Sequence, residues 1–161
     1  ETGNTKNIFT NKYYANEEGI NSRLDEIQSS ILNLKLKFVD KNIKLRKKIA
    51  IKYFKALSNT VLKLPYAHKN RDHVYHLFTV YHPKAKKIMR LLNKRGIQTR
   101  SIYPYPIHKM KAYSKLFKNN KNLNNSFVKS KGIFCLPLYP ELKKNEVDKI
   151  IKEIKGCLKK V

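Results

Sequence analysis

The chain has 161 residues, of which 36 are Lys or Arg, 11 are Asp or Glu and 41% are hydrophobic. This length suits one domain, or a domain with part of a neighbour, and the hydrophobic content excludes disorder along the whole chain. No apolar run approaches the roughly 20 residues of a membrane helix and no secretory leader opens the chain, so we expect a soluble, cytoplasmic protein.

The first expected element is a long helical stretch over residues 22–58, after an irregular polar segment at residues 1–20. Ser22 is predicted as the N-cap, because Asp25 and Glu26 follow it and acidic residues stabilise the first turn of a helix. We expect a helical hairpin or a bent helix here. Two apolar stripes with helical spacing support it: Leu24, Ile27, Ile31, Leu34 and Phe38 in the first, and Leu45, Ile49, Tyr53 and Leu57 in the second.

Strands and a helix are expected next. Residues 74–81 are rich in aromatic and β-branched residues, which favour a buried strand. A helix is predicted to start at Pro83 and to end at Gly96, which would adopt the left-handed conformation. Residues 97–103 are predicted as a second strand, and the Tyr-Pro-Tyr-Pro sequence at residues 103–106 as a stiff turn.

The last third of the chain is expected to hold short elements and a final helix. We predict a short helix at residues 112–117, an exposed loop at 118–125, a helical segment at 127–131 and an apolar strand at 133–138. The order α-α-β-α-β-α-β-α then predicts an α/β (α+β) domain with helices packed on a small sheet. The final amphipathic helix has its apolar stripe at Val147, Ile150, Ile151, Ile154 and Leu158.

The formal charge of +25 indicates binding to nucleic acid at first sight, because Lys and Arg release counterions from phosphates. Thirty of the basic residues are Lys and only six are Arg, whereas base and phosphate recognition favours Arg. Asn (16) and Ile (15) are also abundant while Ala (6) is scarce, as A+T-rich codons would produce. A basic module that binds nucleic acid or an acidic partner therefore remains the alternative.

Histidine and cysteine spacing gives no support to a metal site. His73 and His76 lie three residues apart, which on a strand places them on opposite faces, so we expect one of them in the core with a satisfied N–H. His68 and His82 have no better partners. The two cysteines, Cys135 and Cys157, lack CxxC spacing, so we expect ordinary semi-buried thiols and no disulfide framework or zinc site.

Two constellations are candidates for ligand binding. Tyr103, Tyr105 and His108 surround the stiff turn and could donate hydrogen bonds to a polar substrate, or they could form a structural turn with stacked aromatics. Asn21 and Arg23 lie at the expected start of a helix, where free N–H groups favour an anion. The alternative there is a capping motif in which Arg23 pairs with an acidic neighbour, and spacing leaves both alternatives open.

Four short segments are informative because of their amino-acid sequences and their order along the chain. They are GINSRLDEIQ at residues 19–28, HVYHLF at 73–78, YPYPIH at 103–108 and LPLYPEL at 136–142. Together they closely resemble the GxNxRLDEIQ, HVYHL, HYPxPxH and LPxYPEL segments of the DegT/DnrJ/EryC1/StrS family of sugar aminotransferases. Four matching segments in the same order, spread over most of the chain, make a chance resemblance implausible.

The resemblance implies the C-terminal domain of a pyridoxal-phosphate enzyme of aminotransferase fold type I, with a small sheet preceded by a long helix. Family members are homodimers that move an amino group from glutamate or glutamine to a keto-sugar, usually nucleotide-linked. The family pattern implies that Asn21, with Arg23 close by, binds the cofactor phosphate across the dimer interface. It also implies that Tyr103, Tyr105 and His108 lie toward the sugar.

The same resemblance implies that the catalytic region is missing from this chain. In the family, the Schiff-base lysine, the aspartate that pairs with the pyridine nitrogen and the aromatic that stacks on the ring precede the GxNxR motif. None of the 30 lysines here has the family's context, so we expect no catalytic residue and no transaminase activity from a C-terminal portion alone. We expect residues 1–21 to be a remnant of the cofactor-domain edge, 22–58 the linking helix or helix pair, and 59–161 the small domain.

Overall fold

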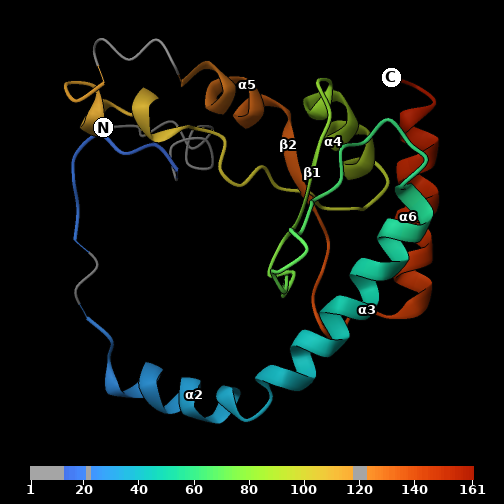
Figure 1. Ribbon diagram of the computed structural model, residues 1–161, viewed down its shortest axis with the longest axis horizontal. Coiled ribbons are helices and arrows are strands. Elements are labelled where there is room, and N and C mark those ends of the chain that lie inside the picture. Colours follow the sequence, from blue (N-terminus) through green and yellow to red (C-terminus); the bar gives the residue numbers. More distant parts are fainter. Residues whose placement is uncertain (1–12, 21–22, 118–122) are drawn as a thin grey trace, which may run out of the picture.

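The computed structural model describes residues 13–20, 23–117 and 123–161, and Figure 1 shows how the helices and strands follow one another. A long arm of two helices leads into a small sheet with further helices packed beside it. The elements, in chain order, are α2 (Glu26–Leu36), α3 (Val39–Leu57), β1 (Phe78–Tyr81), α4 (Ala85–Asn93), the 3-10 helices η2 (Ile107–Lys109) and η3 (Lys111–Tyr113), α5 (Asn124–Gly132), β2 (Ile133–Leu136) and α6 (Lys144–Leu158).

The sheet consists of the two antiparallel strands β1 and β2, with Phe78 opposite Leu136 and Tyr81 opposite Ile133. Because side chains alternate along a strand, Phe78 and Leu136 point into the core. Thr79 and Cys135 are also opposite each other, and the Thr79 hydroxyl lies 3.3 Å from the Cys135 sulfur. The pairing therefore brings residues more than 50 positions apart in sequence into one buried layer.

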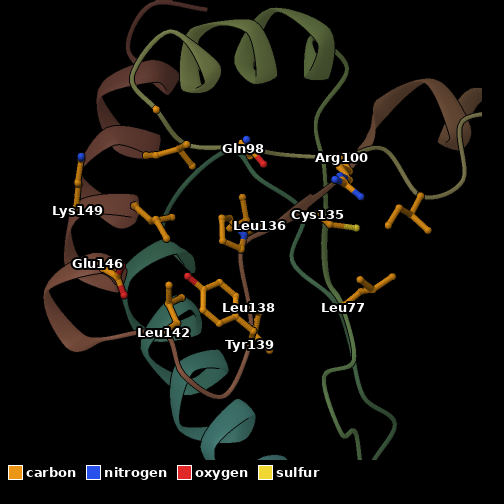
Figure 2. A pocket seen from close by; sticks show the side chains of 15 residues that line it. Leu77, Gln98, Arg100, Cys135, Leu136, Leu138, Tyr139, Leu142, Glu146 and Lys149 are labelled. Atoms are coloured by element: carbon orange, nitrogen blue, oxygen red, sulfur yellow. The ribbon is translucent and has the colours of Figure 1, made fainter. Parts of the chain in front are cut away.

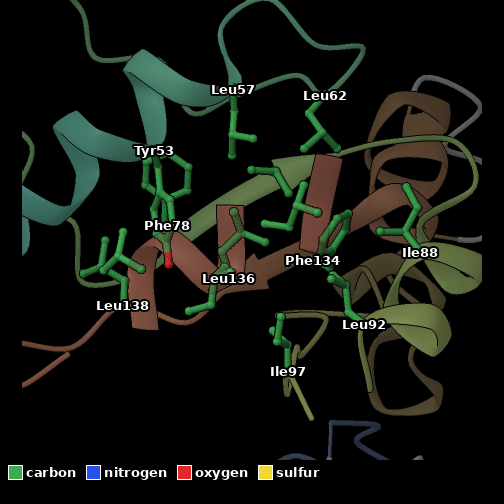
Figure 3. Packing of buried hydrophobic residues seen from close by; sticks show 14 of the residues in the cluster. Tyr53, Leu57, Leu62, Phe78, Ile88, Leu92, Ile97, Phe134, Leu136 and Leu138 are labelled. Atoms are coloured by element: carbon green, nitrogen blue, oxygen red, sulfur yellow. The ribbon is translucent and has the colours of Figure 1, made fainter. Parts of the chain in front are cut away.

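The core forms where α3, α4 and α6 pack against this sheet, and Figure 3 shows side chains of α3, α4 and both strands meeting there. α3 contributes Tyr53 and Leu57, whose side chains are buried against the strands. The Tyr53 hydroxyl donates a hydrogen bond of 2.7 Å to the carbonyl oxygen of Pro137, which satisfies its polar end inside the core. The largest fully buried side chains are Tyr53, Phe78, Phe134, Leu57, Ile88, Leu92, Ile154, Val80, Val147 and Cys157.

The helical stretch expected at residues 22–58 is a bent helix and not a hairpin (Figure 1). The predicted N-cap Ser22 lies outside the described residues, and the helix begins only at Glu26. Asp25 is the cap residue: its backbone is extended and its carbonyl oxygen accepts the first helical bond from the Ser29 N–H, at 2.9 Å. The prediction of a Ser22 cap is therefore wrong, although the acidic first turn is present.

The strand expected at residues 74–81 is only half as long, because β1 starts at Phe78. Tyr75 has a positive φ of 50°, which strand geometry does not allow. The Arg46 guanidinium, from α3, donates hydrogen bonds to the carbonyl oxygens of Tyr75 (3.5 Å), His76 (3.2 Å) and Leu138 (3.1 Å). These carbonyls bind an arginine side chain and so do not extend the ladder.

The strand expected at residues 97–103 is absent among the described residues, and the sheet has two strands where we expected three. This segment touches β2 through one isolated bridge, in which the Cys135 N–H donates to the Arg100 carbonyl oxygen at 2.8 Å. One residue further on, the Ser101 hydroxyl donates to the Ile133 carbonyl oxygen at 3.0 Å. A side chain thus replaces the backbone donor that a continued ladder would need.

The other expected elements agree with the structure apart from their ends. The helix after Pro83 is α4, and Gly96 follows it with a φ of 75°, as predicted for a left-handed helix end. α5, β2 and α6 confirm the elements expected at 127–131, 133–138 and the C-terminus. The short helix expected at residues 112–117 is instead the 3-10 turn η3, and the loop expected at 118–125 lies mostly outside the described residues.

Within the described ranges, no helix combines the length and the apolar character that crossing a membrane requires. The two cysteines are both buried and both free. Burial raises the pKa of the Cys135 and Cys157 thiols, which keeps them protonated and unreactive, as expected for ordinary thiols.

Candidate functional site

The Tyr-Pro-Tyr-Pro turn packs against the start of the described chain. The ring of Tyr13 lies edge-on to Tyr103, with centroids 5.6 Å apart, and Tyr14 lies edge-on to Tyr105 at 5.3 Å. The N–H of Ala112 donates a hydrogen bond of 3.2 Å to the carbonyl oxygen of Ala15. The segment that precedes α2 therefore lies beside the turn although about 90 residues separate them in sequence.

His108 lies on η2, directly after this turn, and is half-buried. Its ring lies 6.3 Å from the ring of Phe117 in an edge-on arrangement. Tyr103 is exposed and Tyr105 is half-buried, so the loop presents both phenol groups near the surface. The structure thus places the three residues predicted for the sugar side on one short loop, each against an aromatic partner from outside residues 103–108.

The second predicted constellation is described only in part, because Asn21 lies outside the described residues. Arg23 is extended into solvent, and its Nε forms an ion pair of 2.7 Å with the carboxylate of Asp25. This is the contact expected if Arg23 pairs with an acidic neighbour. An exposed pair of this kind stabilises little, so the guanidinium remains accessible to a stronger anion.

The buried histidine is neither His73 nor His76, so that prediction is wrong. His76 is exposed, and His73 is half-buried, stacked on Tyr75 at 4.3 Å between centroids. His82 is the buried one: it follows β1 and accepts a hydrogen bond of 3.0 Å from the Lys84 N–H at Nδ1. In the described part of the chain no three His, Cys, Asp or Glu residues gather closely enough to hold a metal ion.

A cavity of about 660 Å³ lies beside β2, between the extended segment 96–102 and α6 (Figure 2). Its floor is apolar and includes Leu136, Leu138 and Leu142. Beside it, the segment 96–102 forms only the isolated bridge between Arg100 and Cys135 and no third strand of the sheet. The cavity also touches Ile102, the residue before Tyr103, and therefore adjoins the predicted substrate loop.

Polar side chains surround this cavity, and the sequence reasoning missed them. Gln98 and Arg100 come from the extended segment, whereas Glu146 and Lys149 come from α6 on the other side (Figure 2). The sequence did contain a signal for Gln98 and Arg100: with Ile102 they occupy every second position of an extended segment, which places their side chains on one face. All three line the cavity. The two residues from α6 had no such signal, because only the packing of α6 brings them there.

Pyridoxal phosphate, implied by the resemblance, would need an anion site and a lysine with a lowered pKa. The accessible Arg23 guanidinium fits the phosphate end. Among the described residues no lysine is buried; Lys47 and Lys52 are half-buried, and Lys47 is paired with the Asp72 carboxylate at 2.6 Å. Among the described residues, Arg23 is thus an accessible cation of the kind that a phosphate would need, and no buried lysine accompanies it.

The fold is shared with solved structures of longer proteins. The structure matches S. venezuelae DesV with a TM-score of 0.81 at 29% identity, covering 93% of this chain and 41% of that one. It also matches NtdA from Bacillus subtilis, solved with bound cofactor PMP, with a TM-score of 0.73 at 27% identity, over 88% of this chain and 34% of that one. The small α/β sheet with its helices therefore has the fold of the matched part of these two proteins.

The family follows from the sequence comparison. The model of the DegT/DnrJ/EryC1/StrS aminotransferase family matches residues 2–155. The dTDP-3-amino-3,6-dideoxy-alpha-D-galactopyranose transaminase of Aneurinibacillus thermoaerophilus is 32% identical over 150 residues, which are 92% of this chain and 41% of the relative. This chain belongs to the DegT/DnrJ/EryC1/StrS aminotransferase family, and it spans about two fifths of the length of such relatives.

Proposed function

We propose that this chain is the C-terminal portion of a pyridoxal-phosphate-dependent aminotransferase that aminates a nucleotide-linked keto-sugar for surface polysaccharide or amino-sugar biosynthesis. The observation that carries this proposal is the family match over residues 2–155, joined to the structural match with DesV over 93% of this chain. The amino donor is glutamate or glutamine, and the reaction takes place in the cytoplasm. Bound cofactor supplies the chemistry that accepts the amino group from the donor and delivers it to the keto carbon.

The proposed roles follow the predicted residues. Asn21 and Arg23 bind the cofactor phosphate across the interface of a homodimer. Tyr103, Tyr105 and His108 bind hydroxyl groups of the sugar, a role supported by their position on one loop near the surface. Because the aromatic partners of this loop hold it against the segment before α2, the sugar and phosphate ends of the site are coupled through residues 13–20.

Of the domain division proposed at residues 1–21, 22–58 and 59–161, the exposure of α2 supports a linking role for this helix, whereas α3 packs into the core of the small domain. No residue of α2 is buried, although Ile27, Ile31 and Leu34 form an apolar stripe on it. An apolar helix face without a partner is unusual in an isolated domain and indicates that another surface covers it. We propose that the cofactor domain of the intact homodimer covers α2.

A chimera tests the proposed activity directly. The matched stretch of the Aneurinibacillus thermoaerophilus relative is replaced by this chain, and formation of 2-oxoglutarate from glutamate is followed with a dTDP-linked keto-sugar as acceptor. We expect amino transfer by the chimera, with a raised KM for the sugar in its His108→Ala variant and unchanged kinetics in its Arg71→Ala variant. A chimera that folds, dimerises and binds the cofactor but transfers no amino group would contradict the proposal.

The chain by itself is proposed to be inactive, because the described lysines are exposed or half-buried. It is mixed with substoichiometric pyridoxal phosphate, reduced with borohydride and digested, and labelled lysines are identified by mass spectrometry. We expect label spread thinly over surface lysines and no amino transfer, whereas the full-length relative is labelled at one lysine. Turnover by the isolated chain, or one dominant labelled lysine, would overturn the claim.

The alternative, a basic module for nucleic acid or an acidic partner, has one observation in its favour. Lys52 and Lys55 of α3 and Lys152 and Lys155 of α6 surround a shallow hollow of about 570 Å³, with Asp148 the acidic residue among them. Binding of duplex DNA is measured against salt for the wild type, for Lys52→Gln/Lys155→Gln and for the control Lys86→Gln/Lys87→Gln on α4. We expect no DNA binding at physiological salt. Binding that falls steeply with salt, and that is lost in Lys52→Gln/Lys155→Gln but not in the control, would favour the alternative.

A further inference from the structure

The loop that carries His108 has few anchors. Residues 103–117 include no buried side chain. The loop leaves the sheet at Ser101, whose hydroxyl donates to the Ile133 carbonyl oxygen, and it contacts the segment before α2 through its tyrosines and Ala112. Because α2, which follows that segment, has no buried residue, these contacts do not by themselves fix His108 relative to the sheet.

A further contact lies directly beside His108. The ammonium group of Lys109 lies over the ring of Phe127, on α5, at 5.6 Å from the ring centroid. A cation within about 6 Å of an aromatic face is attracted by the negative charge of that face. Among the hydrogen bonds and ring contacts of the described residues, this is the one that joins η2 to α5. It therefore acts on the backbone that carries the imidazole.

The helix α5 is a firm support for this contact. It ends at Gly132, directly before β2, and a Cβ at Gly132 would overlap the ring of Tyr81 on β1. The Lys129 ammonium lies over the same tyrosine ring, 4.2 Å from its centroid. Because α5 continues into one strand and packs on the other, Phe127 moves with the sheet.

The ring of Phe127 is also oriented from its own helix. Lys131, one turn further along α5, places its ammonium 3.9 Å from the centroid of the Phe127 ring. Phe127 is half-buried, whereas Lys109 and Lys131 are exposed. The two ammonium groups share one ring and repel each other, so the contact of Lys109 belongs to the weak end of the cation–π range.

We propose that Lys109 and Phe127 are positioning residues for His108, because the contact between them sets where η2 lies relative to the sheet. The inference rests on the proposed function, in which His108 binds a hydroxyl group of the sugar. It adds two residues that act through His108. Without the contact, His108 is in place for only part of the time, and the apparent affinity for the sugar falls by that fraction.

NMR of the chain tests the positioning without any turnover. The ring of Phe117, 6.3 Å from the His108 ring, imposes a ring-current shift on the imidazole signals that depends on how the two rings lie. We expect Lys109→Met and Phe127→Leu to move the His108 signals by similar amounts and the double variant to move them no further. Lys109→Arg keeps the cation and is expected to keep the wild-type signals.

Lys111→Met is the control, since it removes the charge of an exposed lysine two residues further along the same loop. It is expected to leave the His108 signals unchanged. Unmoved His108 signals in Lys109→Met and Phe127→Leu, or an equal change in Lys111→Met, would overturn the proposal.

The chimera tests the consequence for the sugar. We expect Lys109→Met and Phe127→Leu to raise the KM for the keto-sugar about two- to threefold, the size of a weak cation–π contact, and to leave the KM for glutamate unchanged. Phe127→Tyr keeps an aromatic face and is expected to behave as wild type. This split separates positioning from damage to the fold, which would change both KM values.

An unchanged KM for the sugar in an active chimera that carries Lys109→Met or Phe127→Leu would overturn the proposal. A chimera without activity would contradict the proposed function instead, and the NMR result would still decide whether Lys109 and Phe127 position His108.

Discussion

The ring of Tyr14 stands edge-on against the ring of Tyr105, with centroids 5.3 Å apart and the planes at 81°. This contact joins the segment before α2 to the loop proposed for sugar binding, across the whole arm formed by α2 and α3 (Figure 1). The arm itself makes no buried contact along α2. The segment before α2 is therefore held in place by the Tyr14–Tyr105 contact, because α2 itself has no buried residue that could anchor it.

A double-mutant cycle on Tyr14→Ala and Tyr105→Ala measures this contact. We expect a coupling free energy of about 0.5–1.5 kcal/mol in urea unfolding, the usual range for edge-to-face aromatic pairs. Protease cleavage within residues 13–20 is expected to speed up in either single variant. Tyr66→Ala, at an exposed position away from the turn, is the control, and strict additivity of the pair would refute the coupling.

Tyr53→Phe removes the hydroxyl that donates to the Pro137 carbonyl oxygen inside the core. Burial, with a smaller contribution from Tyr139, raises the pKa of Tyr53, so the hydroxyl remains a donor at ordinary pH. We expect the free energy of unfolding to fall by about 1–2 kcal/mol, because the buried carbonyl loses its partner. The exposed Tyr66→Phe serves as the comparison, and equal stability of the two variants would mean that water replaces the bond.

His82 predicts a dependence of stability on pH. Burial and the nearby Lys84 lower the pKa of His82 from its ordinary value of 6.5, so folding favours the neutral ring. The unfolded chain binds the additional proton as pH falls below 6.5, and the contribution of His82 to stability is lost in that range while it is complete above it.

His82→Asn is expected to flatten this part of the pH profile in urea unfolding between neutral and mildly acidic pH. Asn is chosen because its side-chain oxygen can still accept the bond from the Lys84 N–H. The exposed His68→Asn should keep the wild-type slope. The same slope in wild type and His82→Asn would show that another group titrates.

Gly132→Ala is expected to destabilise the protein by about 1–3 kcal/mol, because there is no room for a methyl group. A Cβ at this position would overlap the ring of Tyr81 and lie 3.0 Å from the His82 carbonyl oxygen, and neither β1 nor its end can withdraw easily. Gly19→Ala is the matched control, since nothing lies within 4 Å of its Cβ position. The measurement is the thermal unfolding midpoint of each variant. Equal midpoints for Gly132→Ala and Gly19→Ala would contradict the steric argument.

Local patterns predicted the helices of this fold well and its strands less well. The apolar stripe ending in Tyr53 and Leu57 predicts α3, because the 3.6-residue spacing of apolar residues is visible in the sequence alone. Residues 97–103 have a strand-like composition, yet the Ser101 hydroxyl occupies the next carbonyl of β2. Strand pairing depends on a distant partner, so composition alone cannot predict how far a ladder extends.

In the candidate site, too, local features could be predicted from the sequence and contacts between distant residues could not. The stiff turn with Tyr103, Tyr105 and His108 can be recognised in the sequence, because prolines restrict the backbone locally. Its aromatic partners Tyr13 and Tyr14 cannot, since nothing in the spacing says that they return to the turn. The position of His82 in the core was missed for the same reason: its burial depends on what packs over it.

The sequence by itself determined the family and the helical framework, because four ordered segments and the periodicity of apolar residues are properties of neighbouring residues along the chain. Only the tertiary structure decided the two-stranded sheet, the apposition of the tyrosines and the cavity that combines Arg100 with Lys149. These features arise from contacts between residues tens of positions apart. Such contacts are set by the packing of whole elements, which no local pattern contains.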